Sequence, residues 1–194
     1  MDQISIESMF WQYVGKLNQA FEGANVASIN QLAQSLLNIW QEKRQFMICG
    51  NGGSAGNAIH LANDFLYGIG ERTAIPGMKV EALPANPAVL TCLANDTDYS
   101  KVFAIQLLAK AQKGDMLLVL SGSGNSPNVV QALEEGNRIG MKTFAIVAFS
   151  GGACAEIAQR VIHLEVDDMQ IAEDLQLIVG HICMQSLKSN ASSE

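Results

Sequence analysis

Residues 46–54 read FMICGNGGS, and residues 116–126 read MLLVLSGSGNS. In both stretches an apolar run with strand character ends in a loop of Gly, Ser and Asn, and a helix-like run begins directly after it. Such a loop leaves backbone N–H groups pointing outward at the start of a helix, where the helix dipole also favours negative charge. The two loops together predict a binding site for a phosphate or a similar anion.

The same alternation of strand and helix patterns runs along the rest of the chain and predicts its fold class. Hairpin signals are lacking between the strands, so right-handed crossovers and a mainly parallel sheet are expected. In an open parallel sheet, ligands bind outside the carboxyl ends of the strands, and both loops would emerge there. We expect strands at 45–49, 79–83, 116–120, 143–147 and 161–164, and helices at 6–21, 26–43, 54–66, 88–94, 99–111, 127–139, 154–158 and 171–188.

Composition narrows the class of protein further. The 194 residues fit one domain, and 48% of them are hydrophobic while only 16% are charged. Apolar side chains in this excess indicate that some helix faces meet other subunits. The formal net charge of -7 argues against direct nucleic-acid binding, which depends on Lys and Arg.

The cysteines and the amino terminus point to a reducing compartment. The four cysteines form no CxxC pair and no metal-type spacing, so we expect buried, reduced thiols. The first residues have no signal-peptide pattern, and no apolar stretch approaches the roughly 20 residues that span a bilayer. We therefore expect a cytoplasmic protein without a membrane segment.

The second loop has a simpler structural explanation as well. Ser126 precedes Pro127, which suits the first position of a helix, so Ser126 is expected at the N-cap. Capping alone would account for Ser126, but Ser121 and Ser123 add more polar groups than a cap requires. Neither loop matches a dinucleotide fingerprint, and neither carries the Lys-Ser or Lys-Thr of a triphosphate loop, so no nucleotide cofactor is expected.

Three histidines are candidates for chemistry. His60 and Asp64 are four residues apart in an expected helix and so share one face, as a metal pair, a base with its orienting partner, or a surface hydrogen bond. His163 is expected to be a structural histidine in a strand. His181 lies in an apolar run, where a core histidine is the default, and in a regular helix Glu173 would lie about 12 Å from it along the axis. Local spacing therefore does not establish a metal site.

Taken together, the motifs of this chain resemble those of the sugar isomerase (SIS) domain family, in particular its branch of bacterial sedoheptulose 7-phosphate isomerases. The resemblance covers nearly the whole chain and is carried by residues 50–55 with His60, residues 94–96, residues 113–115 with 121–126, Gly151-Gly152 and His181. It implies a three-layer, flavodoxin-like fold with a five-stranded parallel sheet flanked by helices. It also implies a homotetramer with sites shared between subunits.

On this resemblance, residues 1–194 form a single SIS domain, with helices in 1–43 that pack in the oligomer and an α/β core in 44–190. The implied reaction is aldose–ketose isomerisation of sedoheptulose 7-phosphate through an enediol. The implied catalytic residues are Asp64, Glu173 and His181, and zinc is implied at His60, Asp64, Glu173 and His181. The implied sugar-phosphate site comprises Asn51, Gly52, Gly53, Ser54, Asp96, Ser121, Gly122, Ser123 and Ser126.

The chain departs from the family pattern at three positions. Asp64 stands where the family has glutamate, Glu173 where it has glutamine, and Gly122 where a threonine is usual. Asp64 is one methylene shorter, which matters where proton transfer needs hydrogen-bond contact. These departures keep an alternative open: a non-catalytic SIS-domain protein, such as a factor that associates with a replication initiator or a sugar-phosphate sensor.

Overall fold

The computed structural model describes residues 5–23, 26–70 and 76–191 of the chain. Within these residues, five parallel strands form one sheet in the order β2-β1-β3-β4-β5. This is the flavodoxin-like order, whose switch point lies between β1 and β3. The sheet confirms the expected fold class, and its strands are β1 (Gln45–Cys49), β2 (Lys79–Ala82), β3 (Met116–Ser121), β4 (Lys142–Val147) and β5 (Arg160–His163).

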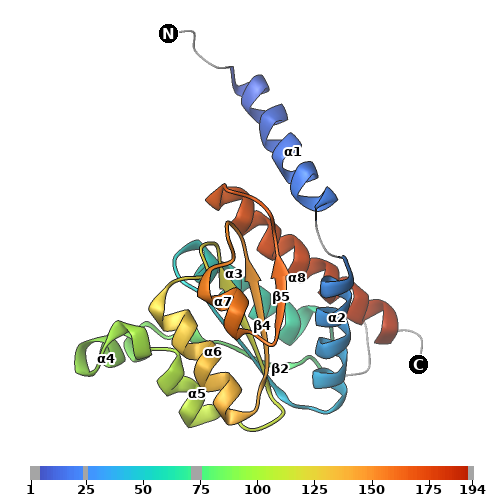
Figure 1. Ribbon diagram of the computed structural model, residues 1–194. Helices are drawn as coiled ribbons and strands as arrows, with labels where there is room; N and C mark the ends of the chain where they lie inside the picture. The colour runs from blue at the N-terminus through green and yellow to red at the C-terminus, as the bar shows by residue number, and fades with distance from the viewer. Residues whose placement is uncertain (1–4, 24–25, 71–75, 192–194) are drawn as a thin grey trace.

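Helices cover both faces of this sheet, giving three layers (Figure 1). Side chains alternate along each strand, so Phe46 and Ile48 face one apolar core while Met47 and Cys49 face the other. The first core is closed by α2 (Val26–Gln41), α3 (Gly53–Asn63) and α8 (Met169–Ala191), and the second by α5 (Ala104–Lys110), α6 (Pro127–Ile139) and α7 (Gly152–Ile157).

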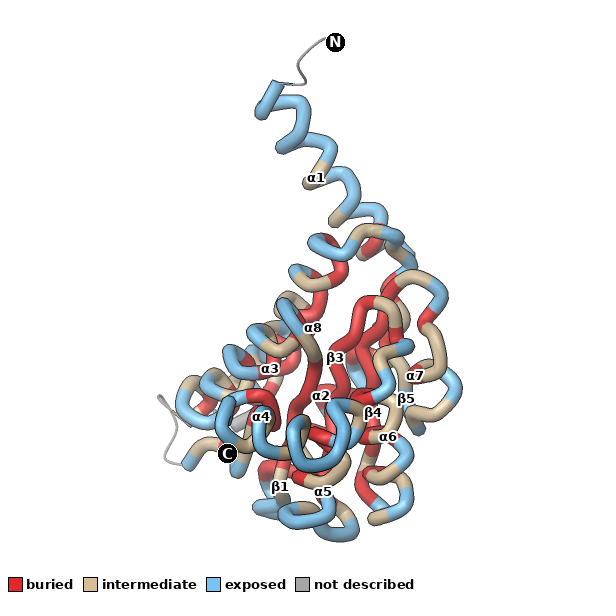
Figure 2. Tube along the Cα trace, turned by 90° about the vertical axis from the view of Figure 1, so that its left-hand side faces the viewer, coloured by how far each residue is buried: buried red, intermediate tan, exposed pale blue. Residues whose placement is uncertain are grey.

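The first helix, α1 (Ile6–Glu22), extends away from the three layers (Figure 1), and Figure 2 shows it almost entirely exposed. Its apolar residues Phe10 and Trp11 are 56% and 63% exposed. Two polar contacts tie it to the body: Tyr13 Oη donates to Asp174 at 2.6 Å, and Lys16 Nζ pairs with Asp168 at 2.6 Å. The hydrogen bond to Asp174 and partial burial raise the pKa of Tyr13 to about 12.

Most expected elements lie within a few residues of the observed ones, and the differences have local causes. The helix expected at 99–111 is two pieces: a 3-10 turn η3 (Tyr99–Lys101), which Asp98 caps by accepting from the Ser100 N–H, and α5. A helix α4 (Pro87–Asp96) and a 3-10 turn η2 (Leu83–Ala85) precede it.

The expectation of four buried cysteines is wrong at one position. Cys92, on α4, is exposed, whereas the thiols of Cys49, Cys154 and Cys183 are buried, and all four cysteines are free. Cys92 is exposed because α4 contributes no buried residue to either core.

None of the described helices combines the length and the apolar character that crossing a bilayer requires.

Candidate functional site

A cavity of about 260 Å³ lies where β1 and β3 end, at the switch point of the sheet. The two Gly/Ser loops meet here, because neighbouring parallel strands deliver their carboxyl ends to the same edge. We call this cavity the serine pocket. It is lined by Asn51, Gly52, Gly53, Ser54, Leu120, Ser121, Gly122, Ser123, Ser126, Met169 and Glu173.

The second loop is held in shape by its own side chains. Ser121 Oγ accepts from the Gly124 N–H at 3.0 Å, and Ser123 Oγ accepts from the Asn125 N–H at 3.3 Å. Gly124 has a φ of +68°, and a Cβ atom there would overlap the carbonyl oxygen of Gly151. The loop therefore needs glycine at this position, and it rests on the loop that follows β4.

Ser126 stands at the N-cap position of α6, as expected, but capping by its side chain does not explain why a serine is there. Its hydroxyl makes no capping hydrogen bond to a described residue; its backbone carbonyl accepts from the N–H groups of Val129 and Val130 instead. Pro127 at the first helical position leaves one fewer N–H group to satisfy. The Ser126 hydroxyl thus remains available to the serine pocket, which it lines.

Asn51 is fixed by two residues that the sequence alone did not single out. Its amide and that of Asn128 form a reciprocal pair, with N···O distances of 2.8 and 2.7 Å, and the Tyr99 hydroxyl donates to Asn51 Oδ1 at 3.2 Å. No local signal in the sequence marks Asn128, which is buried in the first turn of α6.

Asp96 was expected in the same site, but it is not among the described residues that line the serine pocket. It ends α4, where Oδ1 accepts from the Asn95 amide at 2.8 Å and Oδ2 accepts from the Cys92 thiol at 3.4 Å. These hydrogen bonds, that of Asn95 first, lower the pKa of Asp96. Its role in substrate binding remains a prediction.

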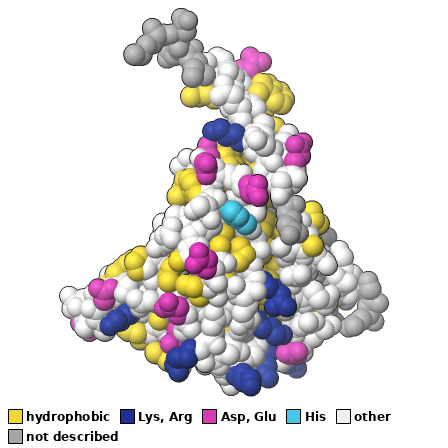
Figure 3. All heavy atoms as spheres, in the orientation of Figure 1, with side chains coloured by type: hydrophobic (Ala, Val, Ile, Leu, Met, Phe, Trp, Pro, Cys, Tyr) yellow, Lys and Arg dark blue, Asp and Glu magenta, His cyan; other side chains and the backbone are white. Residues whose placement is uncertain are grey.

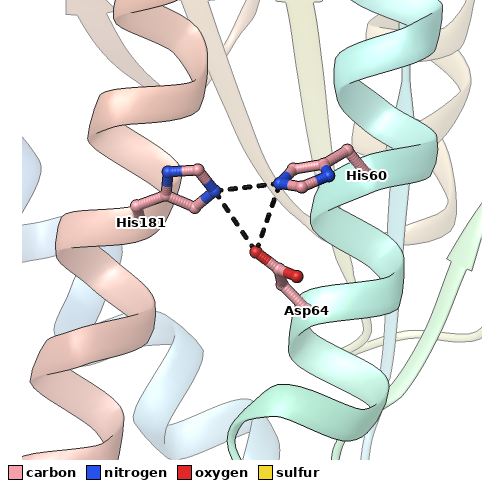
Figure 4. A group of neighbouring side chains, drawn as sticks. All are labelled: His60, Asp64 and His181. Carbon is pink, nitrogen blue, oxygen red and sulfur yellow. Dashed lines mark hydrogen bonds and ion pairs between the residues drawn. The ribbon is translucent and has the colours of Figure 1, made fainter.

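A second group of polar side chains lies on the helices. The Nε2 atoms of His60 and His181 are 3.0 Å apart, and Asp64 Oδ2 lies 3.4 Å from the first and 3.2 Å from the second (Figure 4). We call these three residues the His–Asp cluster. The side chains of His60, Asp64 and His181 are 50%, 20% and 36% exposed, so His181 is not the buried core histidine that its apolar surroundings in the sequence suggested.

Close packing of α3 against α8 brings the cluster together. A Cβ atom at Gly180 would lie 2.8 Å from Leu61 Cδ1, so the absence of a side chain there lets the two helices approach. At the start of the same helix pair, the Asn57 amide donates to the Glu173 carbonyl at 2.8 Å and to Gln176 Oε1 at 3.0 Å. Gly180 is thus the residue next to His181 that allows it to reach His60.

Asp64 is placed by an irregular turn. The α3 helix gives way at this residue to a π-helical turn, η1 (Asp64–Gly68), in which the Ile69 N–H donates to the Asp64 carbonyl at 3.2 Å. Single π-helical turns are rare and occur frequently at functional sites.

The cluster has the donor set and spacing of a metal site. All three donor atoms lie within 4.8 Å of one another, and two imidazole nitrogens with a carboxylate oxygen suit zinc. Donors about 2.1 Å from a tetrahedral zinc ion lie about 3.4 Å apart. The observed separations of 3.0, 3.4 and 3.2 Å are close to this value.

Glu173, the fourth ligand implied by the family resemblance, lies elsewhere in the chain. Its carboxylate lines the serine pocket and lies against Gly53, where a Cβ atom would overlap it. Glu173 and His181 share the unbroken helix α8, eight residues and about 12 Å apart along its axis. A single chain therefore brings three of the four residues together, and the role of Glu173 as a ligand stays a prediction.

His163 has the structural role expected of it. It lies in β5, and its Nε2 is 2.7 Å from the carbonyl oxygen of Phe149.

Comparison with known proteins finds a matching family model, similar sequences and a similar solved structure. A family model described as SIS domain matches residues 9–148. The phosphoheptose isomerase of Desulfovibrio desulfuricans is 33% identical over 171 residues, covering 88% of this chain and 80% of that protein. A probable phosphoheptose isomerase of Thermoplasma volcanium is 32% identical over 178 residues, covering 91% and 89%. The solved structure of a phosphoheptose isomerase from Francisella tularensis matches with a TM-score of 0.87 at 25% identity, covering 95% of this chain and 96% of that one.

Proposed function

The chain belongs to the SIS domain family, and we propose that it is a phosphoheptose isomerase, which interconverts sedoheptulose 7-phosphate and an aldose heptose 7-phosphate. The observation that carries this proposal is the His–Asp cluster, two imidazoles and a carboxylate within 3.4 Å of one another, in a chain that also has a serine-lined pocket at its sheet switch point.

The serine pocket is the proposed phosphate site. The backbone N–H groups at the start of α3 and the hydroxyls of Ser54, Ser121, Ser123 and Ser126 supply hydrogen-bond donors around one cavity. The pocket is lined by no Lys or Arg among the described residues, so these donors would have to hold the phosphate by hydrogen bonding and the helix dipole. Asn51 is held by Asn128 and Tyr99, and would meet the sugar in a fixed orientation.

The proposed reaction moves a proton between two adjacent carbons. Asp64 or Glu173, as the base, removes the proton from the carbon next to the carbonyl, and His181, as the acid, protonates the carbonyl oxygen to give an enediol. The base then returns the proton to the former carbonyl carbon, while His181 takes the hydroxyl proton from the carbon that was deprotonated first, which gives the isomer and restores both residues. We propose that His60, Asp64 and His181 can also hold zinc, which when bound would polarise the substrate carbonyl in place of the acid His181, with Glu173 as the base.

The two parts of the site support a shared, oligomeric arrangement. Within one chain the serine pocket and the His–Asp cluster lie at opposite ends of α3, with Ser54 and His60 about 9 Å apart along the helix axis. Exposed apolar side chains lie on the same elements, within three residues of a cluster residue in the sequence: Ile59, Leu66, Tyr67 and Ile182. We propose a homotetramer in which a neighbouring copy covers this face, the leading helices join the interface, and the cluster of one copy completes the pocket of another.

The activity is tested by incubating the zinc-loaded protein with sedoheptulose 7-phosphate in deuterated water. We expect an aldose product and deuterium at the carbon that exchanges its proton, both detected by NMR. Binding of the sugar phosphate without product and without deuterium uptake would overturn the isomerase proposal and favour the non-catalytic alternative.

The shared site is tested by mixing two impaired variants, Ser121→Ala/Ser126→Ala and His181→Ala, under conditions that exchange subunits and at a sugar-phosphate concentration far below the KM of the serine variant, where both have little activity. If pocket and cluster come from different copies, mixed oligomers regain a measurable fraction of the wild-type activity. Mixtures that stay as inactive as their components would place a complete site within one chain.

A further inference from the structure

The amide pair of Asn51 and Asn128 determines more than the position of the Asn51 side chain. Asn51 belongs to the first Gly/Ser loop and lines the serine pocket, whereas Asn128 lies in the first turn of α6, directly after the second loop. Asn128 is only 1% exposed, so its polar atoms depend on partners within the protein. The pair therefore joins the first loop to the helix that follows the second one through a buried polar side chain.

The backbone fixes which way round the Asn128 amide lies. The N–H of Val129 donates to Asn128 Oδ1 at 3.0 Å, and a backbone N–H group has no acceptor to offer. A reversed amide, with Nδ2 in this place, would set two donors against each other. The oxygen therefore faces Val129, and Asn128 Nδ2 is left to donate to Asn51 Oδ1 at 2.7 Å.

The orientation of Asn128 in turn fixes that of Asn51. Asn51 Oδ1 accepts from Asn128 Nδ2 at 2.7 Å and from the Tyr99 hydroxyl at 3.2 Å, and these two bonds use both lone pairs of the oxygen. Asn51 Nδ2 has two hydrogens, and one of them goes to Asn128 Oδ1 at 2.8 Å. The other has no partner within the described part of the chain. Asn51 thus has a donor to offer a ligand, and no acceptor.

We propose that Asn51 is a dedicated hydrogen-bond donor to an oxygen atom of the sugar phosphate, and that Asn128 is the positioning residue that sets this polarity. The inference rests on the proposed function of the serine pocket. Neutral donors matter there, because none of the described residues that line the pocket is Lys or Arg. On the face shown in Figure 3, Lys and Arg side chains gather instead mainly in the lower part of the molecule.

A fixed donor also discriminates between ligands. A hydroxyl, carbonyl or phosphate oxygen can accept from Asn51 Nδ2. An ammonium group in the same place has only hydrogens to offer, so it would leave both donors unpaired. If the amide of Asn51 could turn over, it would accept from such a group equally well. Asn128 therefore makes the pocket selective for an oxygen at the position that faces Asn51.

The donor role is tested with the seven-carbon alditol phosphate made by reducing sedoheptulose 7-phosphate, which keeps the phosphate and hydroxyl groups but has no carbonyl and cannot be isomerised. Its Kd is measured by calorimetry for the full wild-type chain, Asn51→Ala and Asn51→Asp. We expect Asn51→Ala to weaken binding about 3- to 30-fold, as for one lost hydrogen bond. Asn51→Asp has the same size but only acceptors at pH 7, so it should weaken binding at least as much. Tighter binding by Asn51→Asp than by Asn51→Ala would overturn the donor role.

The positioning role is tested by a double-mutant cycle. Asn128→Leu keeps nearly the same volume and leaves the Val129 N–H bonded to the Ser126 carbonyl at 3.1 Å, so the start of α6 should hold. We expect a several-fold loss of affinity in the wild-type background and little further loss in Asn51→Ala, because Asn128 acts through Asn51. Equal losses in the two backgrounds would overturn this role.

Two further variants complete the experiment. Gln34→Leu removes an amide–amide hydrogen bond to Asn38 on α2, away from the pocket, and should bind as tightly as wild type. Ser121→Ala/Ser126→Ala should weaken binding. If it does not, the sugar phosphate lies outside the serine pocket, and the proposed site and this inference both fail. If it does while Asn51→Ala binds like wild type, this inference alone fails. The comparison of Asn51→Ala with Asn51→Asp stands even if Asn128→Leu does not fold.

Discussion

The serine pocket and the His–Asp cluster are built in different ways. The pocket comes from two short loops that directly follow neighbouring strands, so sheet topology alone brings them together. The cluster joins His60 and His181, which are 121 residues apart and lie on the surfaces of two packed helices. The position of the proposed anion site therefore follows from strand order, whereas the positions of the two imidazoles and the carboxylate depend on the packing of α3 against α8.

The largest expected effect comes from removing the imidazole of His181. We expect His181→Ala to lower kcat by about 10²- to 10⁴-fold, the range typical of a lost general acid or base. The KM for the sugar phosphate should change little, since the phosphate is assigned to the serine pocket. His163→Gln is the matched control, because His163 contacts a backbone carbonyl in β5. A kcat within a few-fold of wild type would show that His181 is not the general acid of the reaction.

The next largest effect is expected from a substitution that disturbs the helix packing that forms the cluster. Gly180→Ala places a Cβ atom against Leu61, so we expect α3 and α8 to separate and zinc to bind about 10- to 100-fold more weakly. Overpacking should also lower the free energy of unfolding by about 1–3 kcal/mol.

Gly56→Ala provides the control for that substitution. Gly56 also lies in a helix, α3, but nothing approaches within 4 Å of a Cβ atom there. It should therefore leave zinc affinity unchanged and raise helix stability by about 0.5–1 kcal/mol. Equal zinc affinity in the two variants, measured by competition with a chromophoric chelator, would show that the close approach at Gly180 is not needed.

A smaller effect is expected in the serine pocket. Ser126→Ala removes a hydroxyl that makes no capping bond to a described residue, so the helix should be unaffected. A hydrogen bond to a charged phosphate contributes about 1.5–3 kcal/mol, which corresponds to a KM roughly 10- to 100-fold higher. The value of kcat should stay near wild type. Ser189→Ala, at the far end of α8, is the control, and an unchanged KM in Ser126→Ala would remove Ser126 from the phosphate site.

The smallest effect concerns the contact that ties α1 to the helix bearing Glu173. The pKa of Tyr13 is raised from 10 to about 12, so the stabilisation from its bond to Asp174 is fully present below pH 10 and is lost as the pH rises through 12. The pair is largely exposed, so its contribution should be well under 1 kcal/mol. Urea unfolding of Tyr13→Phe should show this small loss at pH 7 and a smaller one at pH 11. A difference that grows with pH would contradict the assignment.

The pocket and the cluster also differ in how far the sequence predicts them. The strand at 45–49 and the helix at 127–139 were located because their apolar patterns and boundary signals, such as Pro127, are local. The meeting of the two loops followed from parallel strand order. The pairing of His60 with Asp64 followed from their spacing on one helix.

What the sequence did not reveal depends on contacts between distant segments. Nothing local to His181 indicates that it faces His60, and its apolar neighbours favoured a buried position instead. Gly180 carried the signal, but a helical glycine is interpretable only once its packing partner Leu61 is known. The engagement of the Asn51 amide by Asn128, 77 residues away, was invisible for the same reason.

The strand order also constrains how the chain folds as it is synthesised. Within the sheet, Phe46 of β1 pairs in register with Met116 of β3, a separation of 70 residues, and the other partner of β1, the parallel strand β2, is 34 residues away in register. At about 5–20 residues per second, several seconds pass between synthesis of these two strands. During this interval β1 exposes an apolar edge, so a long-range parallel pairing is expected to limit the folding rate. The switch point that places the two loops side by side is thus completed late in folding, after both strands have been made.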